Sequence, residues 1–142
     1  MNRHYLYDAH FKTPAVPAFL RKLKANGAKL CVATAAPREY VSNGLRRLGV
    51  LGCFDFVTDN RECAYKKEQP EYYAWLLERL GSAAERTWVF EDALYAVRTA
   101  VSLGHPVAAV CDASEPRQEE LARTADWYCR DWTEFPMEIF AG

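Results

Sequence analysis

Apolar strand-like runs alternate with segments of helical periodicity along this chain, and that order restricts the fold more than any other feature. Three runs are almost continuously apolar: Lys29–Thr34, Thr87–Phe90 and Pro106–Cys111. Strands without polar alternation are typical of a parallel sheet that is covered on both faces, and parallel strands need a crossover that is usually a helix. The pattern therefore predicts one domain, residues 1–142, with a doubly wound, Rossmann-like α/β fold and helices on both faces of the sheet.

Prolines and glycines mark most of the expected helix ends. Proline favours the first turn of a helix and glycine the position after its last turn, and the segments between them carry apolar residues at helical spacing. The expected helices are 14–26, 37–48, 70–80, 93–103 and 116–123, with a final helical turn after Asp131. Shorter strands are expected at 54–57 and, as an edge strand, at 127–129, whereas residues 1–12 show no clear period.

Charge and cysteine usage exclude several function classes. The formal net charge is −1, which gives no reason to expect nucleic acid or an anionic membrane as a partner. No apolar run is long enough to cross a bilayer, and no signal peptide opens the chain. The five cysteines include no Cys-x-x-Cys pair. We therefore expect a cytoplasmic protein with reduced thiols, Cys31 and Cys111 being core residues.

Two residues that could bind phosphate stand where ligands bind in α/β sheets, beyond the carboxyl ends of the strands. Thr34 ends one strand just before a helix, so its hydroxyl and the helix N–H groups suit a phosphate; a threonine there is also a common structural residue. Lys67 lies before the helix that Pro70 opens, and a lysine binds phosphate as a point charge. Most lysines are solvated surface residues, however, and Lys66 competes for the role.

The stretch from Thr87 to Ala93 carries the third candidate, the adjacent acids Glu91 and Asp92. Two carboxylates at a strand end are costly unless a positive charge lies between them, and Mg²⁺ takes oxygen ligands of this kind. The alternative is that the two acids only cap the following helix, because acids suit a helix N-terminus. The three candidates together predict one site that holds a phosphate and Mg²⁺.

The ordered set resembles three motifs of the haloacid dehalogenase-like (HAD) hydrolases, in the subgroup of phosphoglycolate phosphatase and β-phosphoglucomutase. Val32-Ala33-Thr34-Ala35 is similar to the second motif of the family. Lys67-Glu68-Gln69-Pro70 is similar to the third, and Val89-Phe90-Glu91-Asp92-Ala93 to the fourth. The likeness extends from about Phe11 to about Phe135.

The resemblance implies a role for each candidate residue. Thr34, with Ala35 beside it, would bind the phosphoryl oxygens of the substrate. Lys67 would bridge the phosphoryl group and the nucleophile, and Glu91 and Asp92 would hold Mg²⁺. Members of the family transfer phosphate from small phosphorylated metabolites through an aspartyl-phosphate, which is nucleophilic catalysis by a carboxylate.

The first motif of the family, Asp-x-Asp-Gly-Thr after a central strand, has no clear counterpart here. The chain therefore resembles the C-terminal core of a longer enzyme, without the nucleophile and the cap domain, and the central first strand is expected to be missing. Tyr5-Leu6-Tyr7-Asp8-Ala9-His10 imitates the motif only in part. Asp8 as the nucleophile is accordingly the less favoured alternative to a solvated N-terminal segment.

A missing central strand has two consequences. The strands that contain Leu30 and Val89 would either pair directly or leave a gap, and an exposed edge invites self-association or a complementing chain. Without a nucleophile, the chain would be a truncated, catalytically inactive HAD-like domain that acts as a binding or interaction module. This is the alternative to a phosphatase or phosphotransferase.

Overall fold

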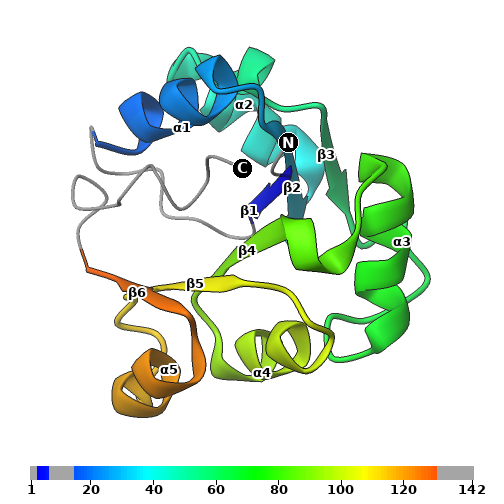
Figure 1. Ribbon diagram of the computed structural model, residues 1–142. Coiled ribbons are helices and arrows are strands. Elements are labelled where there is room, and N and C mark those ends of the chain that lie inside the picture. The colour runs from blue at the N-terminus through cyan, green and yellow to red at the C-terminus, as the bar shows by residue number, and fades with distance from the viewer. Residues whose placement is uncertain (1–2, 7–14, 131–142) are drawn as a thin grey trace.

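A wholly parallel sheet forms the centre of the computed structural model, which describes residues 3–6 and 15–130. Within these residues the sheet has six strands in the order β3-β2-β1-β4-β5-β6 (Figure 1). The strands are β1 (Arg3–Leu6), β2 (Lys29–Thr34), β3 (Phe56–Asp59), β4 (Thr87–Glu91), β5 (Val107–Val110) and β6 (Trp127–Cys129). The predicted doubly wound α/β fold is confirmed, and β6 is the expected edge strand.

β1 occupies the middle of the sheet, so the expectation of a missing central strand is wrong. Leu6 pairs with Val32 of β2 on one side and with Phe90 of β4 on the other. Four residues without a clear period are too few to identify a strand from sequence. Pairing along both edges makes this segment a strand, and it removes the gap between β2 and β4 from which self-association was inferred.

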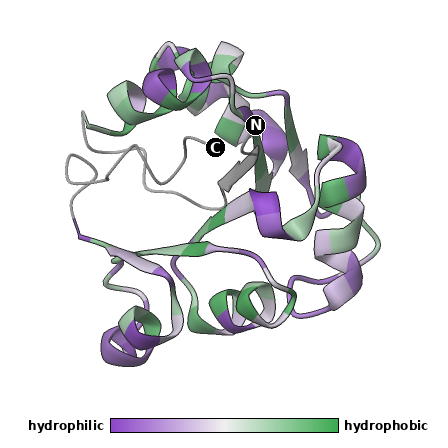
Figure 2. Cartoon of the chain, in the orientation of Figure 1, coloured by the Kyte–Doolittle hydropathy of each residue, from purple (hydrophilic) through white to green (hydrophobic). Residues whose placement is uncertain are grey.

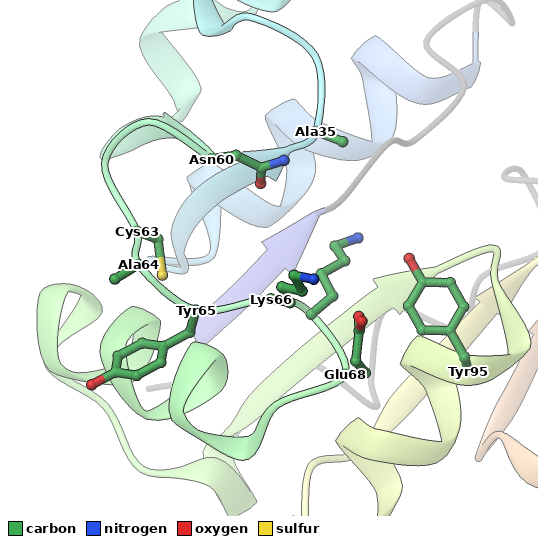
Figure 3. Close-up of a pocket in the computed structure, with 9 residues that line it drawn as sticks. Ala35, Asn60, Cys63, Ala64, Tyr65, Lys66, Glu68 and Tyr95 are labelled. Carbon is green, nitrogen blue, oxygen red and sulfur yellow. The ribbon is translucent and has the colours of Figure 1, made fainter.

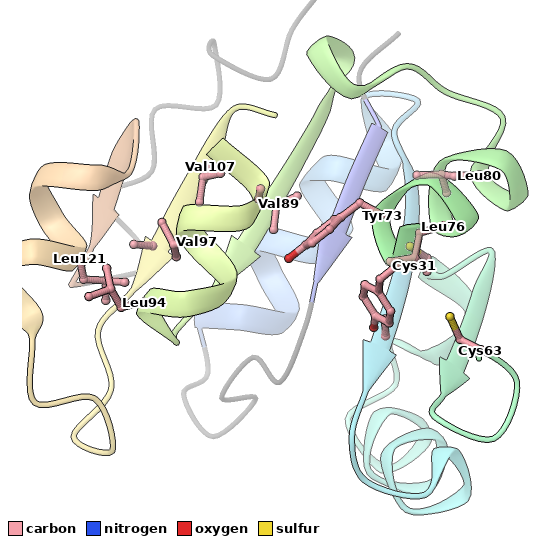
Figure 4. Packing of buried hydrophobic residues seen from close by; sticks show 14 residues of the cluster. Cys31, Cys63, Tyr73, Leu76, Leu80, Val89, Leu94, Val97, Val107 and Leu121 are labelled. Carbon is pink, nitrogen blue, oxygen red and sulfur yellow. The ribbon is translucent and has the colours of Figure 1, made fainter. Parts of the chain in front are cut away.

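Five helices of the described chain cover the two faces of the sheet. They are α1 (Ala15–Ala25), α2 (Arg38–Arg47), α3 (Pro70–Leu80), α4 (Leu94–Ser102) and α5 (Gln118–Thr124), with short 3-10 turns at Leu51–Cys53 (η1) and Ala84–Arg86 (η2). Helices α1 and α2 pack on one face, where Phe19 and Leu45 contact the cluster that includes Phe90. Helices α3, α4 and α5 pack on the other, where Figure 4 shows Tyr73 and Val97 beside Val89.

Successive residues of β4 explain why the strands lack polar alternation. Val89 belongs to the core on one face and Phe90 to the core on the other, and neither side chain is exposed to solvent. Since side chains alternate between the faces of a strand, a sheet that is covered on both sides requires apolar residues at every position. Figure 2 shows the contrast between the largely hydrophobic strands β4 and β5 and the helices, which carry both hydrophilic and hydrophobic residues.

Element ends differ by a few residues from their predicted positions. β3 begins at Phe56 rather than Phe54, and α5 begins at Gln118 rather than Pro116. Helix α3 agrees at both ends: Pro70 is its first residue, and Gly81 follows with φ of 71°, a left-handed conformation that glycine adopts without strain. The expected turn after Asp131 and the N-cap Thr13 lie outside the described residues.

The five cysteines all lie in the described residues and form no disulfide with one another, but they do not share one environment. Cys31 is buried, whereas Cys111 is exposed, so the prediction of a core position is wrong for Cys111. It follows Val110 directly, and β5 ends there, before the chain leaves the sheet. In the described parts of the chain, none of the helices has both the length and the apolar character needed to cross a bilayer.

Candidate active site

The strand register brings the predicted site residues to one edge of the sheet. Val32 and Phe90 both pair with Leu6 of β1, from opposite sides. Thr34 and Asp92 each follow two residues later in the chain, so they leave the sheet at the same level. Two strand spacings separate their backbones by roughly 10 Å, a distance that a phosphate with its ligands can span.

Lys67 enters this edge from the loop between β3 and α3 and pairs with Glu91. The Lys67 Nζ lies 2.6 Å from Glu91 Oε2, and the side chains are 7% and 0% exposed. The other oxygen, Glu91 Oε1, accepts hydrogen bonds from the backbone N–H of Asp92 at 2.9 Å and of Ala93 at 3.3 Å. Sequence reasoning gave Lys67 and Glu91 separate roles; the structure makes them one buried ion pair.

The N–H groups that Glu91 satisfies belong to Asp92 and Ala93, which precede α4, so the alternative that this acid caps the helix is not confirmed. The first N–H of the helix itself is satisfied from elsewhere. Glu115, on the loop after β5, accepts the Leu94 N–H through Oε1 at 2.8 Å, and its Oε2 lies 3.2 Å from Arg117 Nε. The charged run of residues 115–120 is typical of a solvated face, yet Glu115 is buried. The Leu94 N–H and Arg117 keep the pKa of the Glu115 carboxyl below its usual value.

Asp92 supplies the carboxylate best suited to a cation at this edge. It is buried, directly follows the last residue of β4, and donates its backbone N–H to Glu91. Magnesium usually takes one or two protein carboxylates and completes its shell with water and substrate phosphate. The described residues contain no group of three or more Asp, Glu, His or Cys that could enclose a metal. The adjacent acids fit an open magnesium site rather than an all-protein cage.

Thr34 is the last residue of β2, and Ala35 begins the turn that leads to α2. Thr34 is buried, and its Oγ1 accepts a hydrogen bond from the Ala36 N–H at 3.0 Å. Its hydroxyl hydrogen has no acceptor among the described residues, so the group can donate to a ligand oxygen. Ala35 is exposed and lines the neighbouring pocket.

The N-terminus of α2 is less open to an anion than the sequence suggested. The Arg38 N–H, the first of the helix, donates to Asp59 Oδ2 at 2.8 Å. Asp59 also binds the Arg61 side chain, and that guanidinium together with the Arg38 N–H holds the pKa of the Asp59 carboxyl far below its usual range. Asp59 was missed in the sequence, where its position at the end of a strand was the only available signal.

A pocket of about 430 Å³ opens beside Lys67 (Figure 3). Its walls come from Ala35 after β2, from residues 60 and 63–68 of the loop between β3 and α3, and from Tyr95 in the first turn of α4. This volume lies within the range of small-molecule sites. Thr34, Lys67, Glu91 and Asp92 are therefore gathered at one edge of the sheet, with a pocket next to them.

The family of this chain is decided by its sequence as well as its fold. The family model described as haloacid dehalogenase-like hydrolase matches residues 3–104, from β1 to just beyond the end of α4. The chain belongs to this family. A phosphorylated carbohydrates phosphatase from Thermotoga maritima is 34% identical over 93 residues, which are 66% of this chain and 43% of that protein.

Solved structures of the haloacid dehalogenase-like hydrolases have the same architecture. A mutant form of CbbY from Rhodobacter sphaeroides, in complex with xylulose-(1,5)bisphosphate, is 27% identical with a TM-score of 0.73; the match covers 87% of this chain and 55% of that one. An HAD phosphatase from Thermococcus onnurineus is 25% identical with a TM-score of 0.74, over 92% and 58% of the two chains. The chain spans less than half the length of the curated relative.

Proposed function

We propose that this chain forms the phosphate-binding core of a Mg²⁺-dependent phosphatase or phosphotransferase that acts on a small phosphorylated metabolite. The observation that carries the proposal is the buried Lys67–Glu91 pair, at 2.6 Å, on the edge of the sheet from which Thr34 and Asp92 also project. A lysine held this way keeps its charge at a fixed position, whereas a surface lysine would not. Its ammonium suits a phosphoryl group brought to this edge.

Each residue of the site has a separate part in this proposal. The Thr34 hydroxyl donates a hydrogen bond to one phosphoryl oxygen, and Lys67 neutralises charge on another. Glu91 orients Lys67, and it shares with Asp92 the binding of the cation. When bound there, Mg²⁺ would offset the charge that phosphoryl transfer places on the equatorial oxygens. Positioning and electrostatic stabilisation account for most of the catalysis in phosphoryl transfer.

The nucleophile is the part that the described residues do not supply. In the proposed reaction, a carboxylate oxygen bonds to phosphorus while the ester P–O bond breaks, and the leaving oxygen takes a proton. Water then attacks the aspartyl-phosphate and releases phosphate, restoring the carboxylate. Asp8 follows Leu6 in the sequence by the same two residues that separate Thr34 from Val32 and Asp92 from Phe90. Because β1 is central, this spacing favours Asp8 more than the sequence alone did, although residue 8 lies outside the described part.

Relatives support the substrate class. The similar protein from Thermotoga maritima is a phosphatase of phosphorylated carbohydrates, and CbbY has been crystallised with a sugar bisphosphate and, separately, with phosphate. This chain covers only part of each of them, so both the reaction and its substrate are proposals here. Five cysteines without a disulfide among them are compatible with the reducing, cytoplasmic environment that we propose.

A phosphatase assay with Mg²⁺ tests the proposal. We expect the purified chain to hydrolyse a general aryl phosphate, and Asp92→Asn and Asp8→Asn each to lower the rate at least 100-fold, as loss of a catalytic carboxylate commonly does. Glu119→Gln is the control, because its side chain is 95% exposed and lies on α5. Activity that persists in Asp92→Asn would remove this site from consideration.

The second candidate, a binding-only module, is favoured by the absence of a clear nucleophile motif. It predicts that wild type shows no turnover but still binds inorganic phosphate with Mg²⁺ in calorimetry. Under this candidate, Asp8→Asn leaves the dissociation constant unchanged, whereas Asp92→Asn weakens it. Turnover by wild type that depends on Asp8 would exclude the binding-only role.

A further inference from the structure

The pocket beside Lys67 has walls that a phosphate does not need. Inorganic phosphate is far smaller than a volume of about 430 Å³. The walls beyond Lys67 carry Asn60, Lys66, Glu68 and the aromatic side chain of Tyr95. In Figure 3 the Tyr95 ring stands across the pocket from Asn60, and Lys66 is on the loop segment between Tyr65 and Glu68. The pocket therefore has room, and polar groups, for the part of a ligand that is not phosphate.

Tyr95 differs from the polar and charged residues of these walls because it has a large aromatic side chain that is exposed at the surface. It belongs to the first turn of α4, three residues after Asp92, and it is 47% exposed although its neighbours Leu94 and Ala96 are buried. A large aromatic ring at the surface offers rigid contact area and a hydroxyl at low entropic cost. The buried neighbours fix the helix turn, and so they fix where Tyr95 meets the pocket.

The charges of the walls indicate the chemistry of the occupant. Lys67 is neutralised by Glu91, and of the remaining lining groups Lys66 is positive and Glu68 negative. Such a balanced wall suits neither a second phosphate nor a cationic group. It offers donors from Lys66, Asn60 and Tyr95, and acceptors from Glu68 and Asn60. Hydroxyl groups both donate and accept, so a neutral, hydroxylated carbon chain or ring matches the wall.

We propose that this pocket is a leaving-group subsite for a polyol or sugar moiety, and that Tyr95 and Lys66 determine its specificity. The inference rests on the proposed function, because it places the phosphoryl group of the same ligand at Lys67. Tyr95 packs its ring against the carbon skeleton, while Lys66, Glu68 and Asn60 bind hydroxyl groups. The core domain thereby selects its substrate by contacts of its own.

Calorimetry with two non-hydrolysable ligands tests the subsite in the presence of Mg²⁺. Methylphosphonate carries no hydroxyl groups, and 3,4-dihydroxybutylphosphonate carries a diol on the same acid. We expect wild type to bind the diol about tenfold more tightly, the worth of one or two net hydrogen bonds. Tyr95→Ala and Lys66→Met should each reduce this ratio toward one and leave the dissociation constant of methylphosphonate unchanged. Both side chains are exposed, so either substitution should leave the fold intact, which circular dichroism verifies.

Tyr40→Ala is the matched control, because Tyr40 is a 73% exposed tyrosine outside the pocket, and this substitution should leave the ratio as in wild type. Equal affinity of wild type for the two ligands, or a ratio that survives both pocket variants, overturns the subsite while the phosphate site stands. Failure of wild type to bind either phosphonate overturns the proposed function, and the subsite with it.

Discussion

Lys67 Nζ and Glu91 Oε2 lie 2.6 Å apart in a part of the protein that water scarcely reaches. Lys67 comes from a loop and Glu91 from the end of β4, 24 residues later. This contact fixes the loop between β3 and α3 against the central strands. It gives the site both its charge and its geometry, and it makes the two residues interdependent.

Removing one member of this pair should destabilise the protein strongly. Lys67→Met leaves the Glu91 carboxylate buried without its counter-charge, which typically costs about 3–5 kcal/mol in the free energy of unfolding. The double variant Lys67→Met with Glu91→Gln should recover much of that loss, because no unpaired charge stays buried. Urea unfolding of the four proteins of this cycle measures the coupling.

The exposed pair Arg98–Glu120, at 2.5 Å, is the control for that cycle. Its side chains are 55% and 43% exposed, so Arg98→Met should cost no more than about 1 kcal/mol. Equal costs for the two pairs would mean that the Lys67–Glu91 contact is not shielded from solvent.

Glu115 should stabilise the turn that presents Asp92. Glu115→Ala removes the acceptor of the Leu94 N–H at the start of α4, and the loss of a helix cap typically costs about 1 kcal/mol. Glu119→Ala should be nearly neutral, since that side chain is 95% exposed. Chemical denaturation compares the two. A cost for Glu115→Ala no larger than for Glu119→Ala would contradict the capping role.

His105 should make stability fall below neutral pH. Its ring is buried against Tyr73, and Nδ1 lies 2.9 Å from the Thr87 carbonyl oxygen, to which it donates in the neutral ring. Burial lowers the pKa of His105 below 6.5 in the folded protein. The unfolded state therefore binds a proton first as the pH falls, and the free energy of unfolding decreases from about pH 6.5 down to the folded-state pKa.

The variant His105→Gln isolates the part of the pH dependence of stability that comes from His105. Glutamine keeps a donor for the Thr87 carbonyl but does not titrate. The free energy of unfolding of the variant should therefore decrease less between pH 7.5 and 5.5 than that of wild type. Urea titrations at several pH values measure the difference. If the free energy of unfolding changes with pH in the same way for the two proteins, then His105 has the same pKa in the folded and unfolded states, which would contradict this prediction.

Thr34 should contribute to phosphate binding through its hydroxyl. Thr34→Val keeps the shape but removes the donor, and we expect about tenfold weaker binding of inorganic phosphate with Mg²⁺, in line with one or two net hydrogen bonds. Thr34→Ser should retain most of the affinity because the hydroxyl is kept. Calorimetry of the three proteins measures this effect. Weakening in Thr34→Ser but not in Thr34→Val would indicate a packing role for the Thr34 methyl group instead.

The fold could be predicted because its signals are local. Apolar strands such as Lys29–Thr34 and a helix bounded by Pro70 and Gly81 are recognisable from neighbouring residues alone. Strand β1 could not be predicted from the sequence, because Arg3–Leu6 is short and becomes a strand only through its pairing with β2 and β4. The expected gap in the sheet, and the self-association inferred from it, followed from that omission.

The site could be predicted only as a set of positions. Thr34, Lys67, Glu91 and Asp92 stand out because they follow strands or precede helices. The contacts among these residues could not be predicted, since the sequence carries no signal that Glu91 forms an ion pair with Lys67. Glu115 looked solvated for the same reason: its acceptor role depends on a backbone N–H 21 residues away.

A titration of isotope-labelled protein with inorganic phosphate and Mg²⁺, followed by amide NMR, tests the central claim most directly. The claim is that Thr34, Lys67 and Asp92 serve one phosphate site. It predicts that the largest shifts fall together on the amides of Ala35, Ala36, Lys67, Asp92 and Ala93, with a common dissociation constant. No shifts at these amides, or shifts confined to a distant surface such as α5, would contradict it.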